Sequence, residues 1–166
     1  MDNESSAPFL IRPSEKKDIP SILAMAKTLN KFFPKNSLGI LETLLRTQPT
    51  VVGEQGGNLI GFLVYTLRDK ETAEILWMGV KEEFHGLGLG TNLLETLEMM
   101  LAEQGIRKLY TSTLSYTVPY EPYEKVRTFY YRRGFKSIGT EHNFYEEGID
   151  RLILLKSLVH LRSTSP

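Results

Sequence analysis

The stretch that decides the fold is residues 75–94, ILWMGVKEEFHGLGLGTNLL. It opens with an apolar run that predicts a strand over 75–80, and it ends in leucines that recur at helical spacing. Between these two elements, glycines 86, 88 and 90 lie where the chain turns from strand to helix. Glycine accepts positive φ angles and lets a ligand approach closely, while the first turn of a helix presents N–H groups to an anion. The sequence therefore predicts a phosphate-binding loop at residues 85–90.

Two common phosphate-binding motifs do not fit this loop. The nucleotide-hydrolase loop ends in Gly-Lys-Ser/Thr, whereas Gly90 is followed by Thr91 and Asn92. The dinucleotide fingerprint needs a glycine three positions after its second glycine, and that position is Thr91 or Leu93, depending on the alignment. A nucleotide-binding module is therefore disfavoured, and a glycine-rich turn without a ligand remains the alternative.

Working outward from the loop, hydrophobic periodicity predicts a mixture of strands and helices. The predicted strands are Phe9–Arg12, a strand containing Val51 and Val52, Leu59–Leu67, Thr72–Val80, Leu109–Thr113, Phe135–Gly139 and Leu152–Leu155. The predicted helices are one capped by Asp18, Leu38–Arg46, one from Leu89 to before Gly105, and one around Val126–Tyr130 that Gly134 closes. Between the first two helices, a loop is predicted to expose Phe32 and Phe33. With no repeat or linker, we expect one α+β domain over residues 1–166, with a flexible N-terminus at 1–8.

Composition excludes several classes of function. The chain has 166 residues and zero formal net charge, so no basic surface is expected to recruit nucleic acid. It has no cysteine, which rules out disulfides, thiolate metal sites and an acyl-cysteine intermediate. The three histidines, at positions 85, 142 and 160, lack metal-ligand spacing, so no metal is expected. No apolar run approaches the roughly 20 residues of a membrane span, and no signal peptide is evident. We expect a cytoplasmic protein that does not bind membranes.

Two motifs resemble the Gcn5-related N-acetyltransferase (GNAT) superfamily. The loop His85-Gly86-Leu87-Gly88-Leu89-Gly90 is similar to the family's cofactor signature, Gln/Arg-x-x-Gly-x-Gly/Ala, and departs from it only at His85. Residues 129–135, Phe-Tyr-Tyr-Arg-Arg-Gly-Phe, resemble the Phe-Tyr-x-x-x-Gly-Phe element of the family's C-terminal half. The order of the predicted strands and helices also matches.

This resemblance implies a fold, an activity and a cosubstrate. The fold would be α+β (an α/β three-layer arrangement), with a mixed, mainly antiparallel twisted sheet of about six to seven strands flanked by about four helices. The activity would be direct transfer of the acetyl group of acetyl-CoA to a primary amine of a small molecule or peptide, through a ternary complex without a covalent intermediate. The alternative is a non-catalytic acyl-CoA-binding sensor or regulatory module. Dimers are common in the family, so a homodimer is one possibility, and the sequence leaves the oligomeric state open.

The resemblance also assigns roles to individual residues. Cofactor binding falls on the strand end Met78, Gly79 and Val80, on the loop residues His85, Gly86, Leu87, Gly88, Leu89 and Gly90, and on Thr91 and Tyr130. Tyr130 aligns with the family tyrosine beside the cofactor sulfur, where its phenol would protonate the leaving thiolate; a core tyrosine is the alternative. Glu74 resembles the general-base glutamate of the histone-acetyltransferase branch, and a surface glutamate near a turn is the alternative.

The acceptor amine is assigned to an aromatic and acidic region. Residues 116–124 combine tyrosines with carboxylates, and Phe32-Phe33 is expected on the opposite side. Phe33, Glu121 and Tyr123 are the candidate substrate contacts, since such groups hold a cationic amine through cation–π and ionic interactions. Polyamines, amino acids, aminoglycosides and protein amines all remain open as acceptors.

Overall fold

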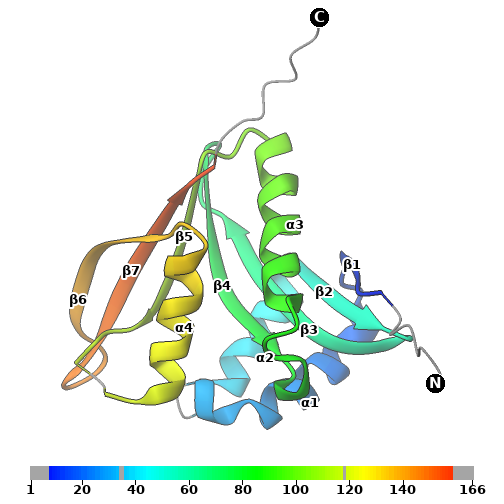
Figure 1. The fold of residues 1–166 in the computed structure, drawn as a ribbon, viewed down its shortest axis with the longest axis horizontal. Helices are drawn as coiled ribbons and strands as arrows, with labels where there is room; N and C mark the ends of the chain where they lie inside the picture. The colour runs from blue at the N-terminus through cyan, green and yellow to red at the C-terminus, as the bar shows by residue number, and fades with distance from the viewer. Residues whose placement is uncertain (1–7, 34–35, 118, 159–166) are drawn as a thin grey trace, which may run out of the picture. The chain divides into compact units, whose positions relative to one another are not determined.

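The computed structural model describes residues 8–33, 36–117 and 119–158 (Figure 1). Apart from Pro8, the predicted flexible N-terminus lies outside these residues. The described strands are β1 (Leu10–Pro13), β2 (Thr50–Gln55), β3 (Asn58–Leu67), β4 (Thr72–Val80), β5 (Lys108–Leu114), β6 (Lys136–Glu146) and β7 (Ile149–Ser157). The α-helices are α1 (Ile19–Thr28), α2 (Leu38–Thr47), α3 (Leu89–Glu103) and α4 (Glu121–Arg132). Short 3₁₀ helices are η1 (Lys16–Asp18), η2 (Asn30–Phe32) and η3 (Glu82–Phe84).

The seven described strands form one sheet in the order β1-β2-β3-β4-β5-β7-β6. Neighbouring strands β1/β2, β2/β3, β5/β7 and β6/β7 are antiparallel, and β4/β5 is parallel. This is the predicted mixed, mainly antiparallel α+β fold. The chain divides into two compact units: a first unit at residues 1–64 and 77–97, and a second unit at 65–76 and 98–166. Strands β3 and β4 and helix α3 run from one unit into the other.

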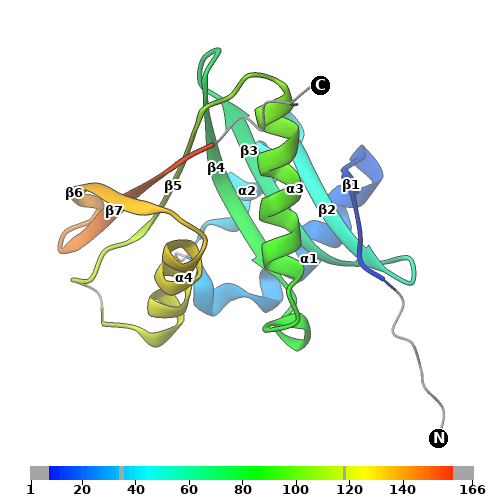
Figure 2. The same ribbon diagram turned by 45° about the horizontal axis from the view of Figure 1, so that its top comes forward.

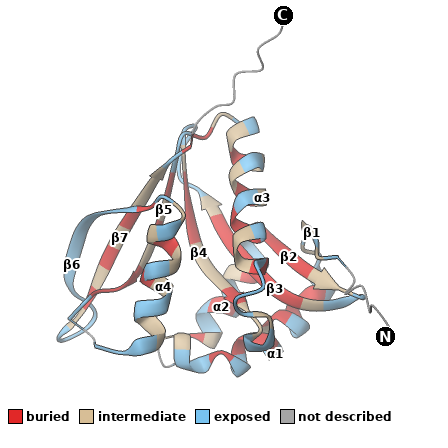
Figure 3. Cartoon of the chain, in the orientation of Figure 1, coloured by how far each residue is buried: buried red, intermediate tan, exposed pale blue. Residues whose placement is uncertain are grey.

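In the first unit, the beginning of α3 packs against two glycines of the sheet, Gly53 on β2 and Gly61 on β3. A Cβ added at Gly53 would lie 2.9 Å from Leu89 Cδ1, and one at Gly61 would lie 3.0 Å from Leu89 Cδ2 and 3.1 Å from Leu93 Cδ1. The leucines of α3 form a buried stripe along one side of the helix (Figure 3). Glycine on β2 and β3 thus lets the first turn of α3 sit directly on the strands.

The opposite face of this part of the sheet packs on α1. Successive residues of a strand point to opposite faces, so Phe62 on β3 faces away from the side on which Gly61 meets α3. A Cβ added at Gly79 on β4 would lie 2.7 Å from the Phe62 ring and 3.1 Å from Leu29, just beyond α1. Helices therefore cover both faces of the sheet within the first unit.

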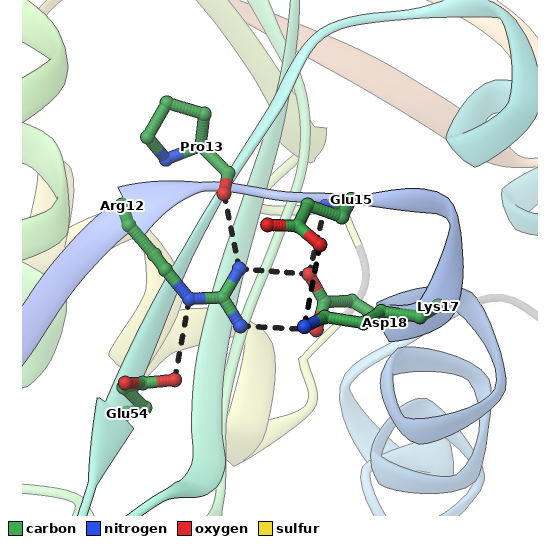
Figure 4. Close-up of polar contacts among 6 residues, drawn as sticks. All are labelled: Arg12, Pro13, Glu15, Lys17, Asp18 and Glu54. Atoms are coloured by element: carbon green, nitrogen blue, oxygen red, sulfur yellow. Dashed lines mark hydrogen bonds and ion pairs between the residues drawn. The ribbon is translucent and has the colours of Figure 1, made fainter.

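An ion cluster joins β1, β2 and η1 (Figure 4). The Arg12 guanidinium donates to both Asp18 carboxylate oxygens, at 2.8 and 3.0 Å, and to Glu54 at 3.2 Å. Asp18 also accepts the backbone N–H of Glu15 at 2.7 Å. Asp18 is the N-cap residue of α1, as predicted, but its side chain makes no cap bond to the helix, because the carboxylate binds Arg12 and the N–H of Glu15 instead.

In the second unit, α4 follows β5, and β6 and β7 form a long hairpin (Figure 2). The predicted strands Phe135–Gly139 and Leu152–Leu155 were too short. The register of β6 against β7 shifts between Ser137 and Gly139 and again between Glu141 and Glu146, and each shift breaks the alternation that marks a strand. Among the described residues, no helix is long and apolar enough to span a membrane.

One loop prediction also needed correction. Phe32 and Phe33 are half-buried rather than exposed, because their rings pack on His85 and Trp77.

Candidate active site

The glycine loop lies in the first unit, between η3 and α3. Gly86 has a φ of +77° and Gly88 a φ of +88°, a region in which L side chains are strained. A Cβ added at either position would have no described heavy atom within 4 Å, so the space beside both glycines is open. Leu89, which follows them, is fully buried, whereas Leu87 is 60% exposed. The loop is therefore anchored by the buried Leu89 and is open on its outer side, beside Gly86 and Gly88.

His85 closes the turn from β4 into this loop. Its Nε2 lies 2.6 Å from the Val80 carbonyl oxygen, so the imidazole donates from Nε2 to the end of the strand. The ring also meets Phe32 edge to face at 5.5 Å. Glu82 in η3 forms an ion pair with Lys31 in η2 at 2.8 Å, so a second contact joins η2 to the segment before the loop. His85 thus holds the loop through its side chain, at the position where the family signature has Gln or Arg.

The strand end assigned to the cofactor arm, Met78–Val80, leads directly into η3. The Val80 carbonyl oxygen accepts the hydrogen bond from His85. The next backbone N–H, that of Lys81, donates to the carbonyl oxygen of Ile60 on β3 at 2.9 Å. The Phe62 ring fills the space that a side chain at position 79 would need, so packing explains why a glycine stands there. Thr91 lies in the first turn of α3.

Phe33, a candidate substrate contact, packs on Trp77 of β4 with ring centroids 5.0 Å apart. The indole Nε1 of Trp77 is buried and has no hydrogen-bond partner among the described residues. Phe33 therefore lies against the strand that carries Met78–Val80, within the first unit.

Tyr130 lies in the second unit and is buried, with 5% of its surface exposed. Its ring packs edge to face on Phe129 and Phe135, at 5.3 and 5.2 Å. Burial raises the pKa of Tyr130 to about 12, and a hydrogen bond with the side chain of Thr111 on β5 opposes that rise. The phenol is therefore protonated at neutral pH and is held by both packing and a hydroxyl partner.

Glu74 is not the surface residue that the alternative interpretation assumed. It is buried on β4, and its carboxylate accepts hydrogen bonds from the guanidinium of Arg68, in the turn after β3. Arg68 is largely exposed, so the ion pair lies at the edge of the protein with its anionic half inside. Arg68 fixes the orientation of the only carboxylate that the sequence nominated as a base.

Sheet register separates Glu74 and Tyr130. Glu74 pairs with Tyr110 on the parallel strand β5, so the two side chains share a face. Thr111, the partner of Tyr130, follows Tyr110 and points to the other face. Within the second unit, the candidate base and the candidate acid therefore approach β4 and β5 from opposite faces.

The remaining substrate candidates lie on the first turn of α4. Tyr123 is half-buried and meets Tyr120 edge to face at 4.8 Å. Glu121 is exposed and pairs with Lys125, one helical turn further on, at 3.3 Å. The structure thus brings Tyr123 into an aromatic group and leaves Glu121 at the surface.

Sequence analysis missed two residues that hold these groups, Arg68 and Thr111. Thr111 lies in the predicted strand over 109–113, where a small hydroxyl residue looks like an ordinary strand residue. Arg68 lies in the predicted turn that precedes the strand over 72–80. Among the described residues, no three His, Asp or Glu side chains are grouped as a metal site would require.

Comparison with known proteins identifies the family. The sequence model of the acetyltransferase (GNAT) family matches residues 22–135. An uncharacterised N-acetyltransferase of Methanocaldococcus jannaschii is 31% identical over 150 residues, which cover 89% of this chain and 91% of that protein. The chain belongs to the acetyltransferase (GNAT) family. The matched range includes Glu74, the glycine loop and Tyr130, and it ends before the β6–β7 hairpin of this GNAT protein.

Solved structures of GNAT proteins share the fold. A protein described as a GNAT-family acetyltransferase from Desulfovibrio desulfuricans superposes with a TM-score of 0.81 at 20% identity, covering 92% of this chain and all of that one. A GNAT-family acetyltransferase from Elizabethkingia anophelis, solved with acetyl-CoA bound, gives a TM-score of 0.72 at 21% identity, covering 90% of this chain and 98% of that one. The predicted GNAT-like fold is thereby confirmed.

Proposed function

We propose that this GNAT protein transfers the acetyl group of acetyl-CoA directly to a primary amine of a small molecule or peptide. The observation that carries the proposal is the glycine loop, whose positive-φ glycines border open space immediately before α3. A phosphate beside such a loop accepts hydrogen bonds from backbone N–H groups and interacts with the positive end of the helix dipole. Family membership selects acetyl-CoA among the phosphate ligands that this arrangement could hold.

The loop residues His85–Gly90, with Thr91 in the first turn of α3, would bind the pyrophosphate. Side chains at positions 86 and 88 would fill the open space, so these positions fit a ligand that approaches the backbone. Met78–Val80 on β4 would bind the pantetheine arm. When bound, acetyl-CoA supplies an activated thioester, whose carbonyl an amine can attack.

Glu74 is our candidate for removing the proton of the acceptor amine. An alkylamine has a pKa near 10.4 and is mostly protonated at neutral pH, so a nearby base or a water that it holds raises the reactive fraction. The hydrogen bonds from Arg68 hold the Glu74 carboxylate in one orientation, which favours a defined proton path.

Tyr130 is our candidate for assisting departure of the thiolate. With a pKa of about 12, its phenol keeps its proton throughout the neutral range. A thiol has a pKa near 8.5, so the phenol is the weaker acid of the two. We therefore infer that Tyr130 stabilises the charge developing on sulfur chiefly through a hydrogen bond donated in the transition state, as preorganised donors do in other acyl transfers.

The test is acetyl-CoA turnover, followed by thiol release, over a panel of polyamines, amino acids, aminoglycosides and lysine peptides. Calorimetry of acetyl-CoA binding runs alongside. We expect micromolar-range binding and turnover of at least one amine class, since KM values of enzymes commonly lie between about 1 μM and 1 mM. Tight binding with no turnover of any amine would instead support the alternative, a non-catalytic acyl-CoA sensor. No binding of acetyl-CoA would contradict both.

A further inference from the structure

His85 departs from the family's cofactor signature, and its side chain makes contacts outside the glycine loop. Its Nε2 donates to the Val80 carbonyl oxygen at 2.6 Å, which fixes the ring relative to the end of β4. The same ring meets Phe32 edge to face, with ring centroids 5.5 Å apart. A glutamine, as in the signature, could donate to the same carbonyl oxygen but would offer no ring to Phe32. The contact with Phe32 is therefore a consequence of the histidine at this position.

Phe32 belongs to residues 30–33, which we call the aromatic segment and which comprise η2 and the residue after it. Two further contacts join this segment to β4 and η3. Lys31 pairs with Glu82 of η3 at 2.8 Å. The Phe33 ring packs on Trp77 of β4, with ring centroids 5.0 Å apart. Three successive residues of the segment thus each contact one residue of the stretch 77–85.

The three contacts differ in strength. Lys31 and Glu82 are both nearly half exposed, and an ion pair between exposed groups contributes little to stability in water. The two ring contacts bury apolar surface and have defined edge-to-face or tilted geometries. The His85 ring therefore supplies one of the two stronger contacts that hold the aromatic segment.

The position of His85 also links this segment to the glycine loop. The next residue, Gly86, has a φ of +77° and borders the open space of the loop. Glycine has more accessible backbone conformations than other residues, so a phosphate bound by the loop N–H groups restricts the backbone beside His85. At its other end, the aromatic segment contacts Trp77, which directly precedes Met78–Val80, the strand end assigned to the pantetheine arm.

We propose that His85 is a positioning residue that transmits occupancy of the glycine loop to the aromatic segment and so sets the position of Phe33, the candidate substrate contact. This inference rests on the proposed function, in which acetyl-CoA fills the loop. A bound phosphate holds the loop, the loop holds the His85 ring, and the ring holds Phe32. An acceptor that contacts Phe33 then loses less conformational entropy on binding, so acetyl-CoA raises the affinity for the acceptor. By linkage, the acceptor raises the affinity for acetyl-CoA by the same factor.

Trp77 is the only tryptophan of the chain, so its fluorescence reports on the contact with Phe33 without any turnover. The measurement is the change in emission at a concentration of acetyl-CoA that calorimetry shows to saturate each protein. We expect a change in the wild type and the loss of most of it in His85→Gln, which retains a donor for Val80 and removes the ring. Phe32→Leu should lose as much, and the double variant should lose no more, since both substitutions remove one contact.

Phe84→Leu is the matched control. It removes a ring from η3, one residue before His85, but that ring meets Phe9 at 6.4 Å and not the aromatic segment. The emission change should therefore be retained. A second readout uses the amine that the panel shows to be acetylated fastest. In His85→Gln, KM for that amine should rise by about fivefold, with a smaller change in kcat, as for a modest coupling between two sites.

The outcomes separate this inference from the proposed function. An emission change that is lost in His85→Gln, with no acetylation of any amine, would sustain the inference and contradict the proposed function. Equal changes in the wild type and His85→Gln, or equal losses in His85→Gln and Phe84→Leu, would overturn the inference and leave the proposed function in place. The absence of any change in the wild type saturated with acetyl-CoA would overturn it in the same way.

Discussion

The glycine loop of the first unit differs from the two candidate catalytic residues of the second unit, Tyr130 and Glu74, in what it presents to a ligand. The loop presents backbone, because Gly86 and Gly88 have positive φ and no side chain beside them. The second unit presents the side chains of Tyr130 and Glu74, each held by one specific partner, Thr111 or Arg68. A backbone site thus depends on conformation and open space, whereas a side-chain site depends on residues contributed from elsewhere in the chain.

The largest effect is expected where a single side-chain atom carries the proposed role. Tyr130→Phe removes the hydroxyl and keeps the packing on Phe129 and Phe135, so the variant should fold and bind acetyl-CoA. Turnover should fall by about 10²-fold or more. Tyr131→Phe is the matched control, because it removes a neighbouring hydroxyl whose partner is Tyr116. Turnover within about twofold of wild type in both variants would make Tyr130 a packing residue.

Glu74→Gln tests the other side chain through pH. At neutral pH, turnover should fall by about tenfold or more, and part of the loss should be recovered as pH rises toward the amine pKa near 10.4, because more amine is then already neutral. The pH–rate profile of kcat/KM on a confirmed acceptor measures this. Arg68→Met should show a smaller loss of the same kind, since it removes only the partner that orients the carboxylate. A profile for Glu74→Gln that coincides with wild type would assign Glu74 a structural role.

Gly88→Asp tests the backbone site. It places a negatively charged side chain in the open space of the loop, and we expect calorimetry to show at least a tenfold loss of acetyl-CoA affinity through repulsion of the phosphate. Because any side chain is strained at this φ, the control is Gly105→Asp, where φ is +85° and the space is equally open. Equal affinities in the two folded variants would place the phosphate elsewhere.

Gly79→Ala distinguishes a glycine required by packing from one required by a ligand. The added Cβ would lie 2.7 Å from the Phe62 ring, so the free energy of unfolding should fall by about 1–3 kcal/mol, as for other overpacked cores. Gly39→Ala on α2, with nothing within 4 Å, should instead increase it by about 0.5–1 kcal/mol. Urea unfolding measures both. A Gly79→Ala protein as stable as wild type would show that the sheet adjusts freely at this position.

The smallest effect is expected at the ion cluster of the first unit. The hydrogen bond from Arg12 lowers the pKa of Asp18, so the folded state favours the carboxylate. The resulting stability is present above the unfolded pKa of about 3.9 and is lost as pH falls through the lower folded value. In urea unfolding between pH 2 and 6, Asp18→Asn should therefore lose less stability on acidification than wild type. An unchanged difference between the two proteins over that range would contradict this assignment.

Whether a prediction from the sequence was confirmed depended on whether backbone conformation or side-chain contacts determine the feature. The glycine loop and the end of α3 before Gly105 lie where the glycines predicted them, since positive φ is a local property. Asp18 begins α1 as predicted but makes no side-chain cap bond, because Arg12, six residues away, binds its carboxylate. The exposed Phe32-Phe33 loop was wrong because Trp77 and His85 meet these rings from distant positions.

By itself, the sequence determined the family, the order of the elements and the glycine loop, because these depend on periodicity and on local backbone preference. The tertiary structure alone decided which side chains meet. It turned Arg68 onto Glu74, six residues further along the chain, and placed Thr111 on Tyr130. Strand register and packing create such contacts, and no local pattern encodes them, since hydroxyl and charged residues can occupy the same strand positions without any partner.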